Sequence, residues 1–346
     1  MPEPRFSYRR CGIVLAPDGS EYEAAGVLNP AITRDRTGKL LMYPRMVAPG
    51  NISRIGIARG NEGPGGPVFE RAGIVLEPQA PNELRSEPGG YGCEDPRVTF
   101  IPPLDAYLMA YTAFGPRGPK VALAISSDAY AWTRLGPVEF ANPALNALPN
   151  KDAAFFPDIV TAPSGTPSFA FYHRPMLLES ITGQAPVELM QSLPPERREV
   201  TCIGYVAAEA ALRDPQALCR AAESVRVLEV GDAWGRLKNG CGTPPVKTAD
   251  GWLSLFHAVD ARDRGDGQAT VYYHAGIVLH DLERLDRVLF RSPEPLLQPE
   301  TGAERFGVVD DVVFPTGIDA RPGGGYDIYY GAADARIARA ELHLLA

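Results

Sequence analysis

This 346-residue chain has little histidine, tryptophan or cysteine, with five, three and five residues respectively. The cysteines are Cys11, Cys93, Cys202, Cys219 and Cys241. Their number is odd and no two form a C-x-x-C pair, so the sequence indicates neither a disulfide framework nor a zinc site. The histidines show no ligand spacing either, and we expect no bound metal. A reducing compartment fits this cysteine usage, and the predicted location is the cytoplasm.

The sequence also lacks long apolar runs and clustered positive charge. No stretch approaches the ~18 apolar residues of a membrane-spanning helix, and the start, MPEPRFSYRR, has no apolar core of a secretory signal. The net charge of −8 argues against nucleic acid as a partner. Glycine loops that cradle nucleotides and the G-x-S-x-G elbow of serine hydrolases do not occur. We expect a soluble protein with no membrane, nucleic-acid or nucleotide-cofactor partner.

Glycine and proline, in contrast, are abundant, with 35 and 34 residues. Proline at this level disfavours long helices and favours many turns between short strands. Hydrophobic residues make up 45% of the chain and charged residues 22%, which suits a globular protein with a large core. The composition therefore favours an all-β protein.

Five segments of the sequence share one pattern. In each, a proline is followed two or three positions later by Ile or Val, then by a turn and an aromatic-rich strand. The leading prolines are Pro30, Pro96, Pro157, Pro244 and Pro315. Each segment continues into a run with apolar residues at every second position, the period of a half-buried strand. Each unit thus has three or four antiparallel strands.

The spacing of the prolines, 66, 61, 87 and 71 residues, is too long for a solenoid and typical of propeller blades with insertions. We therefore predict an all-β, five-bladed β-propeller that uses residues 1–346 as a single domain. Residues 177–235 are interpreted as an inserted segment with a short helical or irregular stretch. The alternative, two unrelated β-sandwiches, would show alternation without the shared proline pattern.

Equivalent positions of propeller blades converge on the central axis, so residues beside the repeated prolines are candidates for one site. They are Asn29, Glu94, Asp95, Arg97, Asp152, Asp158, Lys247, Asp310 and Asp311. The ends of the second strands add Arg45, His173, Arg174, His257, Asp260 and Asp334. Acids and bases among aromatic residues suit a polyol such as a sugar. The alternative is structural: Arg97 can equally pair with Glu94 in a turn, and His257 can equally be a core histidine.

Seven motifs follow one another from about residue 28 to about residue 342: EDPRV, NKDAAFFPDIV, YHRP, GTPPVKTADGWLSLFHAV, SPEPLLQPE, VVFPTG and YYGAAD. Together they resemble the successive motifs of glycoside hydrolase family 130, the β-mannoside phosphorylases and related β-mannosidases on a five-bladed propeller. The resemblance implies an inverting mechanism with Asp95 as general acid, whose proton passes through a sugar hydroxyl. We expect burial beside Glu94 to raise the pKa of Asp95.

The resemblance also implies which residues bind the substrates. The residues expected to hold phosphate are Arg174, Lys247 and Asn150, with His173 nearby. Those expected at the sugar are Arg54, Asp334, Arg45 and Asp152. If water attacks instead of phosphate, Asp152 or Asp260 becomes the candidate base.

Three functions stay open at this point: an inverting β-mannoside phosphorylase that releases mannose 1-phosphate, an inverting β-mannosidase, and a non-catalytic glycan-binding propeller. The cations Arg174 and Lys247 favour the phosphorylase, with a β-mannoside oligosaccharide and inorganic phosphate as substrates and no cofactor. Against it, Pro149 stands where such phosphorylases usually carry an arginine, a loss of ~1.5 to 3 kcal/mol in phosphate binding. The linkage, the acceptor sugar and the formation of a homo-oligomer are left open.

Overall fold

The computed structural model describes residues 5–87, 89–176, 187–231, 233–263 and 269–345. Most of these residues lie in strands, which confirms a mostly β protein. The α-helices of the described ranges are short: α1 (Pro143–Ala147), α2 (Val187–Ser192), α3 (Ala208–Arg213) and α4 (Gly302–Arg305). Single 3₁₀ turns occur at η1 (Glu21–Glu23), η2 (Pro102–Leu104), η3 (Pro195–Arg197) and η4 (Pro215–Cys219). None of the described helices is long and apolar enough to cross a membrane.

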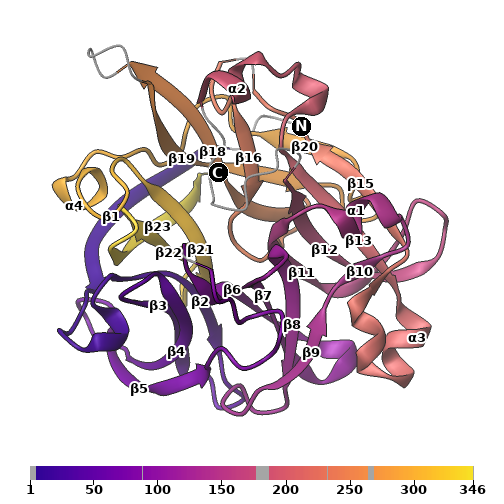
Figure 1. Ribbon diagram of the computed structural model, residues 1–346, viewed down its shortest axis with the longest axis horizontal. Coiled ribbons are helices and arrows are strands. Elements are labelled where there is room, and N and C mark those ends of the chain that lie inside the picture. The colour runs from indigo at the N-terminus through magenta and orange to yellow at the C-terminus, as the bar shows by residue number, and fades with distance from the viewer. Residues whose placement is uncertain (1–4, 88, 177–186, 232, 264–268, 346) are drawn as a thin grey trace.

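The strands follow one another around a common centre in chain order (Figure 1). One sheet has eight strands and consists of two antiparallel halves joined by a short parallel pairing of Ile52 with Tyr91 and Ser53 with Gly92. With its two halves counted separately, the strands form five antiparallel groups. The first group is β2 (Gly26–Arg34), β3 (Leu40–Ala48), β4 (Ile52–Asn61) and β5 (Val68–Leu76). The second is β6 (Tyr91–Ile101), β7 (Ala106–Gly115), β8 (Gly118–Ser126) and β9 (Thr133–Pro137). The third is β11 (Asn150–Thr161), β12 (Pro167–Pro175), β13 (Thr201–Ala207) and β15 (Glu223–Leu228).

The last two groups complete the circuit. The fourth is β16 (Lys238–Cys241) and β17 (Val246–Lys247), which both pair with β18 (Trp252–Asp263), then β19 (Ala269–His280) and β20 (Val288–Arg291). The fifth is β21 (Val313–Ala320), β22 (Tyr326–Ala332), β23 (Arg336–Leu345) and β1 (Arg5–Leu15). A short parallel pair, β10 (Glu139–Phe140) with β14 (Arg220–Ala221), lies outside the groups.

The first strand of each group lies innermost. β2 contacts β6 and β21, β6 contacts β11, β11 contacts β16, and β18 contacts β21. The N-terminal strand β1 pairs antiparallel with β23 and so joins the two ends of the chain in one sheet. These contacts run once around the centre.

The hydrophobic core lies between neighbouring groups, because each sheet turns alternate residues toward each adjacent sheet. Tyr43 and Ile55 of the first group pack with Met109 of the second, and Leu123 of the second packs in another cluster with Phe171 of the third. All five side chains are fully buried. Period-two alternation in the sequence therefore becomes layers of apolar contact between sheets.

Residues 177–235, interpreted from the sequence as an insertion, contain two regular strands of the third group, β13 and β15. Between them, α3 and η4 bury Ala211 and Leu218 in the core cluster shared by the second and third groups. Residues 177–186 and 232 lie outside the described residues. The additional segments are therefore the stretches before β13 and between β13 and β15.

Candidate active site

Three innermost strands, β2, β6 and β11, carry a bulge near their start, where the register with the neighbouring strand shifts. At these bulges Asn29, Asp95 and Asp152 have positive φ angles of 42°, 47° and 59°. Asn and Asp tolerate this left-handed conformation best among residues with a side chain, and a bulge turns a side chain in a new direction. Three consecutive groups thus present a polar side chain at the same end of their inner strands.

The first cluster, which we call the acid cluster, consists of Asn29, Arg45, Glu94, Asp95 and Asp334. Asp95 Oδ1 accepts hydrogen bonds from Asn29 Nδ2 at 2.9 Å and from Arg45 Nη1 at 3.1 Å. Arg45 Nη2 also donates to Glu94 Oε1 at 2.8 Å. Asp334 interacts electrostatically with Arg45 and with both neighbouring carboxylates. The predicted residues Asp95, Arg45 and Asp334 therefore do meet.

The pKa of Asp95 is lowered, so the expectation of a raised value is wrong. Burial by itself would raise this pKa, but the charges of Arg45 and Arg97 outweigh it. Burial does raise the pKa of Glu94, and it raises the pKa of Asp334 to about 6. In this cluster a proton resides more readily on Glu94 or Asp334 than on Asp95.

Arg97 is buried and has a structural task. Its guanidinium donates to the carbonyl oxygens of Cys241, Gly242 and Asp95, each at 3.0 Å. Arg97 therefore bonds the second group to the fourth across the centre and holds the backbone of Asp95, rather than pairing with Glu94. Its Nη2 also lies 3.9 Å from Asp152 Oδ1, so one guanidinium holds the Asp95 backbone and approaches the Asp152 carboxylate.

The second cluster, which we call the arginine cluster, consists of Asp152, Arg174, Glu199, Lys238 and His257. Arg174 Nε donates to Asp152 Oδ2 and Arg174 Nη1 donates to Glu199 Oε2, both at 2.7 Å. His257 Nε2 lies 3.5 Å from Asp152 Oδ2, and Lys238 is buried close enough to Arg174 for their charges to interact. All five residues are buried.

The charges of the arginine cluster shape its protonation. Burial and the charge of Arg174 lower the pKa of Lys238 to about 8, although Glu199 and Asp152 oppose the shift. Burial would raise the pKa of Asp152, but Arg174 and other cations outweigh it and hold that pKa below its ordinary value. Near neutral pH the cluster therefore contains a cationic Arg174, an ionised Asp152 and a lysine that loses its proton unusually easily.

Lys238 and Lys151 are site residues that the sequence analysis missed. Lys151 interacts electrostatically with Asp95 and with Asp152, so it stands between the two clusters. The sequence feature that could have pointed to Lys238 is its position two residues before Gly240 on a short strand. A Cβ on Gly240 would overlap Asp152 Oδ2 and the His257 ring, so this strand passes directly beside the cluster.

Two predicted residues lie elsewhere. Lys247 Nζ binds Asp158 Oδ2 at 2.6 Å, and both side chains are partly solvent-exposed. On β18, Lys247 pairs with Trp252, whereas Gly240 beside the arginine cluster pairs with His257. Trp252 and His257 are five residues apart, which is ~17 Å along a strand. The prediction that Asp158 and Lys247 lie beside Asp95 is therefore wrong. The repeated prolines stand at different heights on their strands, so alignment on the prolines does not align the site.

His173 and Asn150 form a buried pair. Asn150 Nδ2 lies 3.0 Å from His173 Nδ1, and His173 Nε2 lies 2.8 Å from Ser224 Oγ. The imidazole packs between Phe140 and Phe171, with ring centroids 4.7 and 5.6 Å away. Burial lowers the pKa of His173 to about 3, so it is a neutral core histidine that orients Asn150.

Arg54 is turned away from the acid cluster. It pairs with Met46 along the β3–β4 ladder, whereas Arg45 pairs with Ile55, so the two arginines project from opposite faces. Arg54 Nε donates to Glu77 Oε2 at 2.6 Å, and the guanidinium lies 5.0 Å from the Tyr22 ring.

Other candidates have structural partners. Asp260 accepts hydrogen bonds from the backbone N–H groups of Gly235 and Arg236 at 2.6 and 3.0 Å, so it secures the turn before β16. Asp311, two residues before β21, pairs with Arg262. Asp310 accepts a bond from the N–H of Gly307 at 3.2 Å. These carboxylates hold loops in place.

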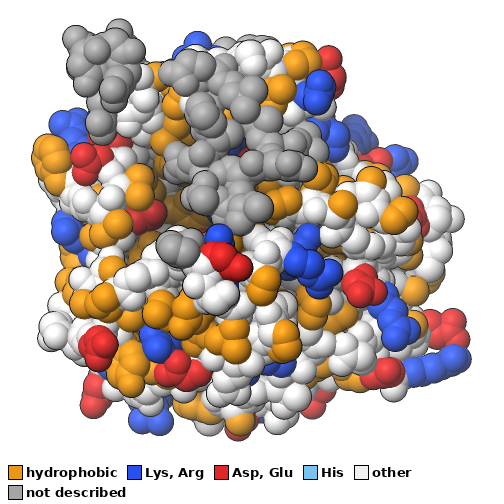
Figure 2. All heavy atoms as spheres, viewed as in Figure 1, with side chains coloured by type: hydrophobic (Ala, Val, Ile, Leu, Met, Phe, Trp, Pro, Cys, Tyr) orange, Lys and Arg blue, Asp and Glu red, His pale blue; other side chains and the backbone are white. Residues whose placement is uncertain are grey.

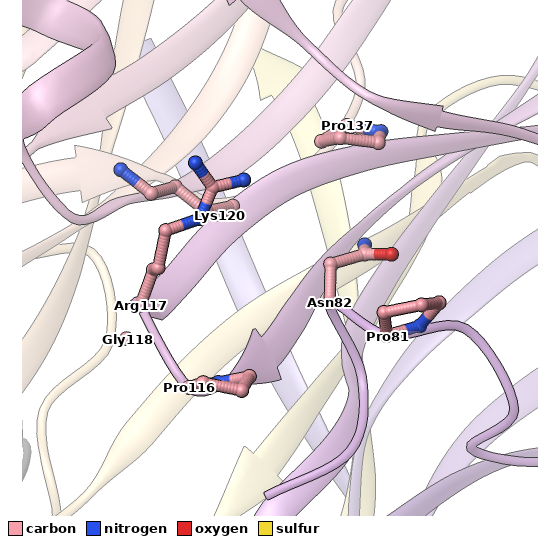
Figure 3. Close-up of a pocket in the computed structure, with 7 residues that line it drawn as sticks. All are labelled: Pro81, Asn82, Pro116, Arg117, Gly118, Lys120 and Pro137. Atoms are coloured by element: carbon pink, nitrogen blue, oxygen red, sulfur yellow. The ribbon is translucent and has the colours of Figure 1, made fainter.

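The molecular surface carries cavities beside the second group. One of about 290 Å³ lies at the β7–β8 turn and is lined by Pro81, Asn82, Pro116, Arg117, Gly118, Lys120 and Pro137 (Figure 3). A neighbouring cavity of about 190 Å³ shares three of these residues and reaches Asn150. The face shown in Figure 2 intersperses basic and acidic side chains. In the described ranges no set of three or more His, Cys, Asp or Glu residues is placed to hold a metal ion.

Comparisons with known proteins show the family to which the chain belongs. The chain is 29% identical over 341 residues to the 1,2-β-oligomannan phosphorylase of Thermoanaerobacter sp. (strain X514), and the alignment covers 96% of this chain and 95% of the relative. The fold of this chain resembles that of the β-1,2-mannobiose phosphorylase of Listeria innocua in complex with β-1,2-mannobiose, with a TM-score of 0.72 and 20% identity. That comparison covers 97% of this chain and 96% of the other chain.

A second solved structure is similar in fold at a TM-score of 0.68, with 21% identity and coverage of 99% and 95%. It comes from work on hydrolases within the mannoside phosphorylase family that target β-1,2-mannosidic linkages in Candida mannan. The family model of glycoside hydrolase family 130, described as β-1,4-mannooligosaccharide phosphorylase, matches residues 5–176 and 224–345. This protein is therefore an enzyme of glycoside hydrolase family 130, a family of mannoside phosphorylases and glycosidases.

Proposed function

We infer that the five strand groups are the blades of a five-bladed propeller. Support comes from the contacts of the inner strands, which run once around the centre, and from the pairing of β1 with β23. Closure of this kind leaves no open edge between the first and the last sheet. Both clusters then lie on the central axis, where the inner strands begin.

We propose that the protein is an inverting β-mannoside phosphorylase. The observation that carries this proposal is the pair of buried cations, Arg174 and Lys238, beside the ionised Asp152. Arg97 lies between this cluster and the backbone of Asp95. Phosphate is already a nucleophile, so a phosphorylase needs cations to hold it rather than a strong base. The names of the similar enzymes favour β-1,2-linked mannosides as the substrate, and the family description makes β-1,4-linked ones the alternative.

In the proposed reaction Asp95 is the general acid. The charges of Arg45 and Arg97 lower the pKa of Asp95 in the free enzyme, so proton transfer requires that the bound mannosyl ring weaken these contacts and raise that pKa. The proton moves from Asp95 through a sugar hydroxyl to the leaving oxygen while the C1–O bond breaks. A phosphate oxygen bonds to C1 from the opposite face, so the products are α-mannose 1-phosphate and a shortened sugar.

The test is incubation with β-1,2- and β-1,4-mannobiose, with and without inorganic phosphate. We expect α-mannose 1-phosphate in the presence of phosphate and little free mannose in its absence. Equal release of mannose with and without phosphate would refute phosphorolysis. Hydrolysis is the second candidate function, because two carboxylates, Asp152 and Glu199, already occupy Arg174.

A further inference from the structure

Glu199 is a buried carboxylate that the proposed mechanism does not use. It lies between η3 and β13, within the stretch 177–223 that the family model leaves unmatched. Only about 6% of the residue is exposed, and its side chain points at Arg174, with Glu199 Oε2 2.7 Å from Arg174 Nη1. A segment outside the match to the family model therefore delivers a negative charge to the guanidinium expected to hold phosphate.

The hydrogen bonds of Arg174 leave no complete edge for an anion. A guanidinium binds phosphate best in bidentate fashion, through two parallel N–H groups along one edge. Both edges of Arg174 include Nη2, paired with Nε on one side and with Nη1 on the other. Nε is bonded to Asp152 and Nη1 to Glu199, so each edge already has one donor in use.

The two carboxylates are not held equally. Asp152 stands on β11 at a bulge with positive φ, and it is also within 3.5 Å of His257 and 3.9 Å of Arg97. Glu199 lies outside regular structure, and its carboxylate accepts a hydrogen bond from Arg174 and interacts electrostatically with Lys238. Glu199 is therefore the carboxylate that can leave.

We propose that Glu199 is a specificity-determining residue that competes with phosphate for Arg174 and so sets the phosphate concentration at which the enzyme works. The proposal rests on the proposed phosphorolysis. Phosphate binding breaks the Glu199–Arg174 ion pair and frees the Nη1/Nη2 edge. With Glu199 in place, phosphate meets two cations, Arg174 and Lys238, and two carboxylates. Without Glu199 it would meet the same two cations and only one carboxylate.

The test compares Glu199→Gln with the wild type. The amide keeps the size of the side chain but removes its charge. We expect the phosphate KM, and the Kd of inorganic phosphate measured by calorimetry without sugar, to fall about tenfold or more, the scale of one charge-assisted hydrogen bond. The kcat at saturating phosphate should change much less. Glu196→Gln, an exposed charge removal in the same segment, serves as the matched control and should change neither constant.

Each other outcome is informative. An unchanged or raised phosphate KM and Kd in Glu199→Gln, with an active wild type, would overturn the competition while leaving phosphorolysis intact. Phosphate-independent release of mannose by the wild type that disappears in Glu199→Gln would instead refute the proposed function and make Glu199 the base for water. If Glu199→Gln does not fold, Glu199→Asp, which withdraws the charge by one methylene, should still lower the phosphate KM, and an unchanged value would overturn the proposal.

Discussion

Replacement of Asp95 by asparagine separates a catalytic acid from a structural turn. Asparagine keeps the shape of the side chain, and its oxygen can still accept the bonds from Asn29 and Arg45, which are 2.9 and 3.1 Å long in the wild type. It cannot deliver a proton. We expect kcat on an unactivated β-mannoside to fall ~10²-fold or more, the usual contribution of a general acid.

The same change has a calculable effect on folding. Two hydrogen bonds to an ionised carboxylate become neutral ones, a loss of ~1 kcal/mol each, so the free energy of unfolding at pH 7 should fall by ~2 kcal/mol. Because the folded-state pKa of Asp95 is lowered, its stabilising contribution is present above the unfolded pKa of ~3.9 and is lost as pH falls through the folded value. The deficit of the variant should therefore shrink in acid.

The assay is turnover of mannobiose beside urea denaturation at pH 7. Asp158→Asn is the matched control, because Asp158 also follows a repeated proline but lies partly exposed and paired with Lys247; its kcat should stay at the wild-type level. An aryl mannoside with an acidic leaving group needs no proton, so Asp95→Asn should retain most activity on it. Near-normal turnover of unactivated mannobiose by Asp95→Asn would show that Asp95 is not the acid.

Three further outcomes follow from the structure. Lys238→Met should raise the phosphate KM about tenfold or more, at the scale of a charged hydrogen bond, while Lys247→Met leaves it unchanged; equal effects would contradict the placement of the site. Arg97→Met removes the donor of three buried carbonyl bonds and should lower the free energy of unfolding by ~3–5 kcal/mol in urea denaturation, against less than ~1 kcal/mol for the exposed Arg36→Met. Asp334, with a pKa raised to about 6, costs the wild type stability as pH rises from ~4 through 6, because the folded carboxyl holds its proton more tightly. Asp334→Asn should therefore gain stability relative to wild type from about pH 4 to about pH 6.5, and a constant difference over this range would argue against the raised pKa.

Local pattern determined the class of the fold, and the resemblance of the ordered motifs to a known family singled out Asp95 as the candidate acid. Alternation of apolar residues depends only on the two-residue period of a strand, so it predicted strands with one apolar face. Asn29 and Asp95, each directly before a proline, lie at bulges where a short polar side chain tolerates positive φ. That preference belongs to the residue and its neighbours, and it is visible in the sequence.

Only the tertiary structure decided which charges meet. Lys238 rather than Lys247 reaches Arg174 because the height of each inner strand along the axis depends on packing between sheets, which the spacing of prolines does not record. Glu199 reaches the same arginine from a segment between strands. The pKa of Asp95 is lowered rather than raised because Arg45 and Arg97 come from other positions in space. Electrostatic energy falls with distance in three dimensions, so it cannot be read from order along the chain.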